Sequence, residues 1–152
     1  MNYKILIVDD EQLERRALES SIVLQLGTRV EIMQAVNGRD AVQMAREFRP
    51  DIAFLDIKMP IMNGIEAGKE ILEFLPDCYI IMLTGFTYFT YAKESVNIGA
   101  ADFLVKPAAD EDVVKALEKA TREVESRIRK RIDDEENRKK VRRAEQYMEG
   151  EL

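Results

Sequence analysis

The sequence contains no histidine and only one cysteine, Cys78, among its 152 residues. Without histidine the chain has no Ser-His or Cys-His nucleophile pair, and it lacks the commonest ligand of transition metals. It also cannot carry a phosphohistidine of its own. A single cysteine excludes a disulfide framework, and because Cys78 lies in the apolar stretch DCYIIML we expect a buried core thiol.

Long apolar runs and an N-terminal leader are also missing. No stretch reaches the about 18 apolar residues that a membrane-spanning helix needs, and no basic segment is followed by an apolar run and a cleavage site. We therefore expect a cytoplasmic protein that makes no membrane contact. The 152 residues are enough for one domain with a core plus an extension.

Charge is distributed unevenly along the chain. Residues 1–120 hold 13 basic and 20 acidic side chains, a difference of −7, whereas residues 121–152 hold 10 basic and 9 acidic ones, a difference of +1. An acidic domain is not suited to binding nucleic acid by itself. The sequence therefore predicts an acidic domain over 1–120 and a charge-dense extension over 121–152.

Short apolar runs alternate with segments of helical periodicity five times. We expect strands over 5–8, 29–36, 49–56, 78–85 and 101–107. We expect helices over 11–26, 37–48, 63–76 and 88–99, and a last helix that Asp110 caps. Because parallel strands need crossover connections, this alternation predicts an α/β fold, a doubly wound five-stranded parallel sheet with helices on both faces.

The C-terminal segment has no proline or glycine between residues 111 and 149. An apolar residue recurs there every three or four positions, at Val113, Leu117, Ala120, Val124 and Ile128. Beyond Ile132 the apolar stripe thins, and opposite charges recur at i,i+4, as in Glu135 with Lys139. Two interpretations are open: an extended helix that dimerises as a coiled coil, or a frayed charged linker.

Polar side chains stand where four of the five predicted strands end. Asp9 and Asp10 follow the first strand, Asp56 ends the third, Thr84 the fourth and Lys106 the fifth. The carboxyl ends of parallel strands are where sites form, and clustered carboxylates need a cation such as Mg²⁺. The set predicts a phosphoryl-acceptor site in which Asp56 is the nucleophile, Thr84 binds a phosphoryl oxygen and Lys106 supplies positive charge.

These residues lie in the stretches ILIVDDE, FLDIKMPIMNG, IIMLTG and FLVKP, which resemble the motifs of the receiver domain of two-component response regulators. The resemblance covers about residues 1–120. It implies a flavodoxin-like sheet of order 2-1-3-4-5. It also implies a phosphorylation-dependent signalling switch that takes its phosphoryl group from a sensor histidine kinase and has no turnover substrate beyond its own phosphorylation and dephosphorylation.

The resemblance implies a magnesium site as well. Asp56 matches the phosphoacceptor, and Asp9 and Asp10 match the acidic pair, of which the second residue binds Mg²⁺ directly and the first largely through water. The backbone carbonyl of Lys58 matches a further metal ligand. The peptide bond between Lys106 and Pro107 is expected to be cis.

Switching is implied by three further positions. Thr84 and Lys106 match the switch hydroxyl and lysine, and movement of Thr84 toward a phosphoryl group leaves space for the aromatic ring of Phe103. Phe86 is expected to shield the phosphoryl group from water. The surface of the fourth helix, fifth strand and fifth helix then changes, which implies a homodimer through that surface or through the C-terminal helix.

The stretch YAKESVNIGAADFLVKP is similar to receivers joined to AraC-type helix-turn-helix regulators. No two-helix unit with a tight glycine turn follows it here, so we expect DNA contact only through an output domain absent from this chain. The chain is then either a stand-alone receiver or a fragment cut in a linker.

Two other interpretations remain open. In haloacid-dehalogenase-type phosphatases an aspartate nucleophile precedes a Ser/Thr and a lysine, an order that Asp9, Thr84 and Lys106 reproduce. That family has a second aspartate where Glu11 stands here, and it would leave Asp56 unexplained. The other interpretation is a receiver-shaped protein-interaction domain that is never phosphorylated.

Overall fold

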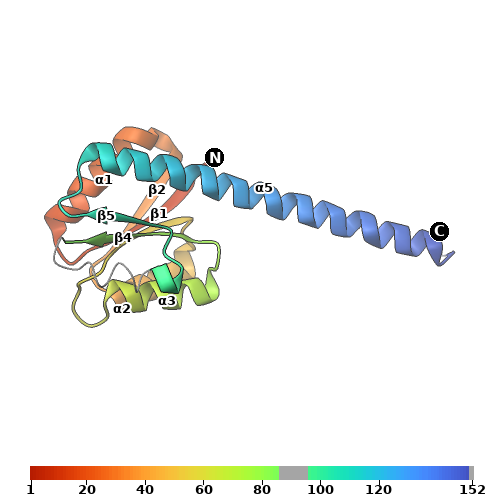
Figure 1. Cartoon of the computed structure of the whole chain (residues 1–152), viewed down its shortest axis with the longest axis horizontal. Coiled ribbons are helices and arrows are strands. Elements are labelled where there is room, and N and C mark those ends of the chain that lie inside the picture. The colour runs from red at the N-terminus through yellow and green to blue at the C-terminus, as the bar shows by residue number, and fades with distance from the viewer. Residues whose placement is uncertain (86–95, 151–152) are drawn as a thin grey trace.

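Residues 1–85 and 96–150 are described by a computed structural model, drawn in Figure 1. The strands are β1 (Tyr3–Val8), β2 (Val30–Ala35), β3 (Ile52–Asp56), β4 (Tyr79–Thr84) and β5 (Asp102–Val105). The helices are α1 (Gln12–Leu26), the short 3₁₀ helix η1 (Gly27–Arg29), α2 (Gly38–Phe48), α3 (Gly64–Phe74) and α5 (Asp110–Met148). The predicted alternation of strands and helices is confirmed over these ranges.

The strands form one parallel sheet in the order β2-β1-β3-β4-β5. The order implied by the resemblance is therefore confirmed. It places β1 and β3 side by side at the centre, with β4 next to β3. The carboxyl ends of β1, β3, β4 and β5 consequently lie along one edge of the sheet, which we call the carboxyl edge.

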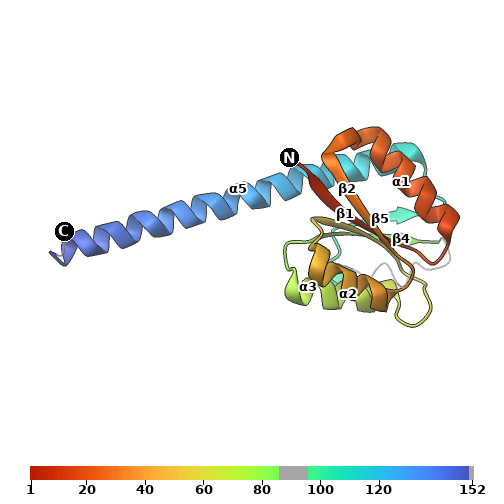
Figure 2. The same cartoon turned by 180° about the vertical axis from the view of Figure 1, so that it is seen from behind.

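Helices cover both faces of the sheet, with α1 and α5 on one side and α2 and α3 on the other (Figures 1 and 2). Alternate residues of each strand serve the two faces, as the pleat requires. In β1, Ile5 and Ile7 join the core beneath α1 and α5, whereas Leu6 and Val8 join the core beneath α2 and α3. Burial on both faces explains why the strands are continuous apolar runs in the sequence.

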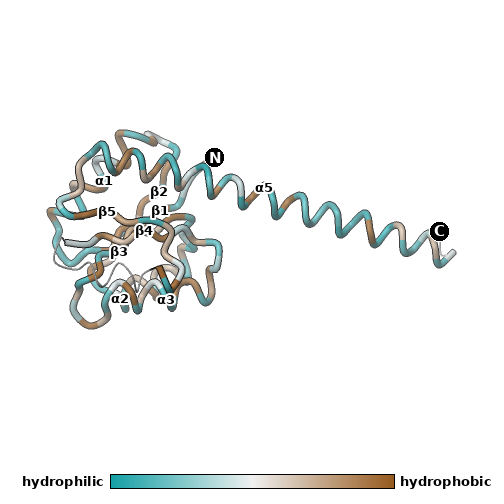
Figure 3. The backbone as a smooth tube through the Cα atoms, viewed as in Figure 1, coloured by the Kyte–Doolittle hydropathy of each residue, from teal (hydrophilic) through white to brown (hydrophobic). Residues whose placement is uncertain are grey.

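The long helix α5 has two unlike halves. Its first half buries Val113, Ala116, Leu117, Ala120 and Val124. Every residue over 129–150 is exposed, and Figure 3 shows this second half as an almost entirely hydrophilic arm. Glu135 and Lys139 approach to 4.0 Å there. The tail is helical rather than frayed, and residue 120, the predicted domain boundary, lies inside the helix. The coiled-coil dimer stays a prediction.

The start of α5 differs from the prediction. Asp110 does not cap the helix: Ala109 occupies the cap position and Asp110 is the first helical residue. The Asp110 carboxylate instead accepts a hydrogen bond of 2.5 Å from the Ser21 hydroxyl of α1, which competes with the capping geometry. The helix predicted over 88–99 and the shielding role of Phe86 fall largely or wholly outside the described residues.

Two other local predictions are confirmed, the buried Cys78 and the cis peptide bond before Pro107. Cys78 is buried, and burial raises the pKa of its thiol to about 12, so it stays a neutral core group. The peptide bond between Lys106 and Pro107 is cis. Among the described helices, none combines the length and the apolar character that crossing a membrane requires.

Candidate functional site

The register of the sheet sets the predicted site residues side by side. Val8 of β1 pairs with Leu55 of β3, so Asp9 and Asp56 follow at neighbouring positions of the carboxyl edge. Thr84 pairs with Val105, so Lys106 follows at the same edge. Because a one-residue slip would turn these side chains to the other face, the apolar pattern of the strands also fixes the site.

Lys106 connects two of the carboxylates. Its ammonium group donates to Oδ2 of Asp9 at 2.9 Å and to Oδ2 of Asp56 at 3.2 Å. The other carboxylate oxygen of Asp9 accepts the backbone N–H of Glu11 at 2.9 Å. Asp9 is 1% exposed and Asp56 5%, so both carboxylates are buried beside the Lys106 ammonium.

Three carboxylates meet at this point. One carboxylate oxygen each of Asp9, Asp10 and Asp56 lies within 4.8 Å of the others. Asp10 is exposed whereas the other two are buried. Oxygen donors at this spacing suit a hard divalent cation, since Mg²⁺ is commonly held by one or two carboxylates. The donor set therefore fits the predicted metal site.

Burial and like charge shift the acidity of the central residue. Burial first, and the neighbouring Asp9 charge second, raise the pKa of Asp56 from 3.8 to about 6, although Lys106 acts in the opposite direction. For Lys106, burial lowers the pKa, but its bonds and charge interactions with Asp9 and Asp56 outweigh this and raise it above 10.5. Lys106 is therefore protonated at neutral pH and offsets part of the negative charge.

An open cavity exposes Asp56 to reactants. Its lining residues are Asp10, Glu11, Asp56, Ile57, Lys58, Met59, Pro60, Thr84, Gly85 and Lys106. The Thr84 side chain is buried, and its hydroxyl donates to the carbonyl of Gly85 at 3.2 Å. The predicted nucleophile, hydroxyl and ammonium group thus share one cavity, and Lys58 lies at its rim.

The loop after β3 is shaped by a close backbone approach. Gly64 donates its N–H to the carbonyl of Ile57 at 2.9 Å, and a Cβ atom at Gly64 would lie 2.2 Å from the carbonyl oxygen of Asp56. Only glycine fits this approach. Asn63 then caps α3 by accepting the N–H of Glu66. The loop therefore folds back against Asp56 and leaves its carboxylate open to the cavity.

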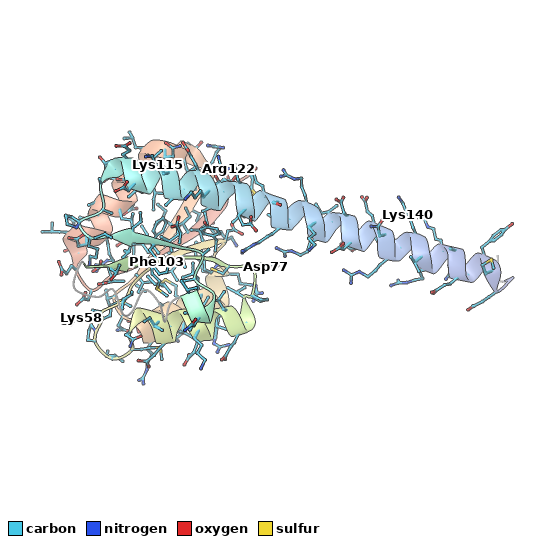
Figure 4. All side chains as sticks on the ribbon, viewed as in Figure 1. Lys58, Asp77, Phe103, Lys115, Arg122 and Lys140 are labelled. Atoms are coloured by element: carbon cyan, nitrogen blue, oxygen red, sulfur yellow. The ribbon has the colours of Figure 1, made fainter. Side chains whose placement is uncertain are left out.

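Two predicted site residues, Asp9 and Phe103, are not among the residues that line this cavity. Asp9 lies behind it and reaches it through the Lys106 ammonium, whereas Phe103 is farther away. It is half-buried on β5 and packs against the core beneath α2 and α3. Figure 4 labels Phe103 near the middle of the domain and Lys58 at the side of the domain away from the exposed part of α5. Its switch role stays a prediction.

Arg15 is a site neighbour that the sequence does not predict. Its guanidinium donates to the carbonyl of Asp9 at 2.7 Å and to Oε1 of Gln34 at 3.0 Å, so it ties the start of α1 to β2 and to the site. Both contacts depend on how the helix packs beside the sheet. A basic residue in the first turns of a helix carries no local signal for either partner.

Comparison with known proteins agrees with this geometry. The family model of the response regulator receiver domain matches residues 5–118. The chemotaxis protein CheY of Thermotoga maritima is 40% identical over 122 residues, which cover 80% of this chain and all of that protein. The solved REC domain of AraT, a response regulator from Geobacillus stearothermophilus, has a TM-score of 0.78 at 32% identity, over 84% of this chain and 98% of that one.

One longer relative also matches the C-terminal helix. The uncharacterized transcriptional regulatory protein YesN of Bacillus subtilis is 32% identical over 154 residues, which cover 97% of this chain but only 42% of YesN. The relatives therefore include a protein as short as the receiver domain and a regulator more than twice as long. On the family match, the sheet order and the cluster at the carboxyl edge, this chain belongs to the response regulator receiver domains.

Proposed function

We propose that Asp56 accepts a phosphoryl group and that the chain is a phosphorylation-controlled signalling switch. The carrying observation is the position of Asp56, which is buried at the end of β3, opens into the cavity and lies 3.2 Å from the Lys106 ammonium. A carboxylate held in this way is a rigid nucleophile. Because the chain has no histidine, the donor is a phosphohistidine of a sensor kinase or a small acyl phosphate.

The transfer makes one bond to phosphorus and breaks one. A carboxylate oxygen of Asp56 forms a bond to phosphorus while the phosphorus–nitrogen bond of the phosphohistidine, or the phosphorus–oxygen bond of the acyl phosphate, breaks. The leaving group keeps the electron pair of that bond. The product is an aspartyl phosphate, and water later cleaves it to restore Asp56 and release phosphate. The chain therefore acts on itself and has no other turnover substrate.

Asp9, Asp10 and Asp56 would hold Mg²⁺, with the backbone carbonyl of Lys58 as a further ligand. The support is the 4.8 Å grouping of the three carboxylates and their hard oxygen donors. A magnesium ion bound there would offset the negative charge of the carboxylates and of the phosphoryl oxygens. Asp9 is oriented for this role by the Glu11 N–H, and Lys106 faces the same space.

Lys106 and Thr84 are proposed to bind the transferred group. Lys106 already bridges Asp9 and Asp56, so its charge faces the place where the phosphoryl oxygens would lie. The Thr84 hydroxyl would exchange the Gly85 carbonyl, now 3.2 Å away, for a phosphoryl oxygen. That movement would free space toward β5, which Phe103 is proposed to fill.

The partners belong to the same proposal. A sensor histidine kinase supplies the phosphoryl group, and a second copy of the chain binds through the β5–α5 surface or through the exposed half of α5. Because the phosphoryl donors, a kinase phosphohistidine or an acyl phosphate, are made in the cytoplasm, we propose a cytoplasmic location. The acidic domain would contact DNA only through a further output domain, as in a regulator of AraC type.

The test is intact mass after incubation with acetyl phosphate. We expect a gain of one phosphoryl group, about 80 Da, that requires Mg²⁺ and is lost in Asp56→Asn. Asp51→Asn is the matched control, since Asp51 is an aspartate at the opposite end of β3 and should leave the gain unchanged. A gain that survives in Asp56→Asn, or none in the parent chain, would contradict the proposal.

The two other interpretations have less support. Both carboxylate oxygens of Asp9 accept hydrogen bonds, from Glu11 and from Lys106, so Asp9 is less open to attack a phosphorus atom than Asp56. The relatives and solved structures that match the chain give no support to a haloacid-dehalogenase-type phosphatase. An interaction domain without phosphorylation would gain nothing from three clustered carboxylates beside a cavity that a hydroxyl and an ammonium group also line.

A further inference from the structure

The helix α5 leaves the domain at the end of the sheet opposite the candidate site. Figure 1 shows the N-terminus, which begins β1, beside α5 at this point of departure. Figure 4 shows Asp77 near the same place and Lys58 of the site at the other end of the domain. Asp77 lies in the loop before β4, so α5 emerges at the amino ends of the strands, which we call the amino edge.

Arg127 holds this part of α5 to the loop before β4. Its Nη1 donates to the carbonyl of Asp77 at 2.7 Å, and its guanidinium lies 5.9 Å from the ring centre of Tyr79, the first residue of β4. Its Nε also donates to Glu123 at 3.1 Å, which fixes the direction of the side chain. One turn later, Arg131 approaches the Asp77 carboxylate to 3.4 Å.

A second tie joins α5 to β1. The hydroxyl of Tyr3, which is 1% exposed, donates to the carboxylate of Glu125. Burial, and then the bond with Glu125, raise the pKa of Tyr3 to about 12, so the hydroxyl keeps its proton at neutral pH. Apolar packing accompanies these polar contacts: Val124 is buried, and Ile128 packs against the core beneath α1 and α5.

The two strands that hold α5 are strands that carry the site. β1 begins at Tyr3 and is followed at its other end by Asp9 and Asp10. β4 begins at Tyr79 and ends at Thr84. Each strand is paired on both sides near the site but on one side only where it starts, at Tyr3 and at Tyr79. Each is therefore a continuous element that joins the site to a less constrained end at the amino edge.

We infer that a change at the phosphorylation site is passed to the exposed half of α5 through a set of contacts that we call the amino-edge anchor. The anchor consists of Tyr3, Asp77, Glu125, Arg127 and Arg131. The inference rests on the proposed function. When Thr84 turns toward a phosphoryl group, β4 shifts and the Arg127 contacts at its start change. Beyond Arg131, no hydrogen bond or ion pair joins the described part of the exposed arm to the domain, so the anchor is the last set of polar contacts that fixes α5 before the arm begins.

The experiment is hydrogen exchange of the full chain, with and without Mg²⁺ and acetyl phosphate, beside intact mass on the same samples. In the phosphorylated parent chain the amide exchange rates over 124–132 should change by about threefold or more. In Arg127→Ala and in Tyr3→Phe the mass gain should persist while that change falls below about half its size. Tyr3→Phe keeps the ring in the core, so it separates loss of the anchor from loss of folding.

Arg122→Ala is the matched control. Arg122 is an exposed arginine of α5 five residues before Arg127, and its removal should leave the response over 124–132 as in the parent chain. A full mass gain with unchanged exchange in the parent would overturn the inference and leave the proposed function standing. A full response in both Arg127→Ala and Tyr3→Phe would overturn it as well. No mass gain in the parent would overturn the proposed function and this inference with it.

Discussion

The carboxyl edge and the amino edge of the sheet both bring acidic and basic side chains together, but in different environments. At the carboxyl edge three carboxylates face one ammonium group, and burial raises the pKa of Asp56 to about 6. At the amino edge, Arg127 and Arg131 meet Asp77 and Glu123 in matched and partly exposed pairs. The carboxyl edge therefore holds buried negative charge in excess, whereas the ion pairs of the amino edge are partly exposed to solvent.

This difference in burial and charge distinguishes a reactive site from a structural contact that holds a helix in place. Buried like charges cost stability unless a cation joins them, and the carboxyl edge accepts that cost while keeping an open cavity. The exposed ion pairs of the amino edge contribute little each. They act together with Tyr3 and with Val124 to hold one helix in one direction. Substitutions at the two edges should therefore differ in size and in sign.

The largest effect is expected for Gly64→Ala. The added Cβ would lie 2.2 Å from the carbonyl oxygen of Asp56, and a backbone atom of a central strand cannot move aside cheaply. We expect a loss of about 3 kcal/mol or more in the free energy of unfolding, with slower phosphorylation. Urea unfolding measures the first and intact mass the second. Gly150→Ala is the control for the clash, since its Cβ would meet nothing within 4 Å and only the positive φ of 71° at the exposed end of the helix would strain it.

Lys106→Ala should destabilise the protein by a similar amount when Mg²⁺ is absent. Asp9 and Asp56 would lose the cation between them, and removing one partner of a buried pair costs about 3 kcal/mol. Added Mg²⁺ should restore stability more in this variant than in the parent chain, because it would no longer compete with the lysine. Thermal unfolding with EDTA and with Mg²⁺ tests this, and equal Mg²⁺ effects in both proteins would refute it.

Asp56→Asn should change the free energy of unfolding in the opposite direction and stabilise the protein. Folding raises the pKa of Asp56 from 3.8 to about 6, so the folded state binds a proton more tightly than the unfolded state, and the parent chain loses stability as pH rises through this range. Without Mg²⁺ the variant should be about 2 kcal/mol more stable above pH 6, with no gain below about pH 4. Urea unfolding across pH measures the difference, and a gain independent of pH would contradict the titration of Asp56 as its cause.

The smallest effect is expected at the amino edge. Arg127→Ala should lower the free energy of unfolding by about 1 kcal/mol or less, because its partners are partly exposed and its ion pair is screened. Arg122→Ala should change it by less. A loss of several kcal/mol in Arg127→Ala would mean that the two edges do not differ as described. Urea unfolding of the two variants beside the parent chain decides this.

The sheet and the site could be predicted because both follow from local pattern. Apolar runs such as 52–55 identify buried strands, and the residue after each run falls at the carboxyl edge whatever the details of packing. Asp9, Asp56, Thr84 and Lys106 can therefore be found from position alone. Their distances, and the bridge that Lys106 forms between two carboxylates, depend on the register of strands far apart in the chain.

The contacts that could not be predicted involve side chains that meet only after packing. Asp110 has the sequence context of a helix cap, yet the Ser21 hydroxyl of α1 donates to its carboxylate. Arg15 and Arg127 resemble ordinary charges on helices, and both bind backbone carbonyls of other segments. No pattern within one helix indicates such partners, because a long basic side chain can serve many of them.

The most direct test of the account is to identify the residue that carries the phosphoryl group. Borohydride reduces an aspartyl phosphate to homoserine, so treatment after acetyl phosphate and Mg²⁺, followed by peptide mapping, marks the residue itself. The account predicts homoserine at Asp56, which lies in the open cavity beside Lys106. Homoserine at Asp9, or at no aspartate of the carboxyl edge, would contradict it.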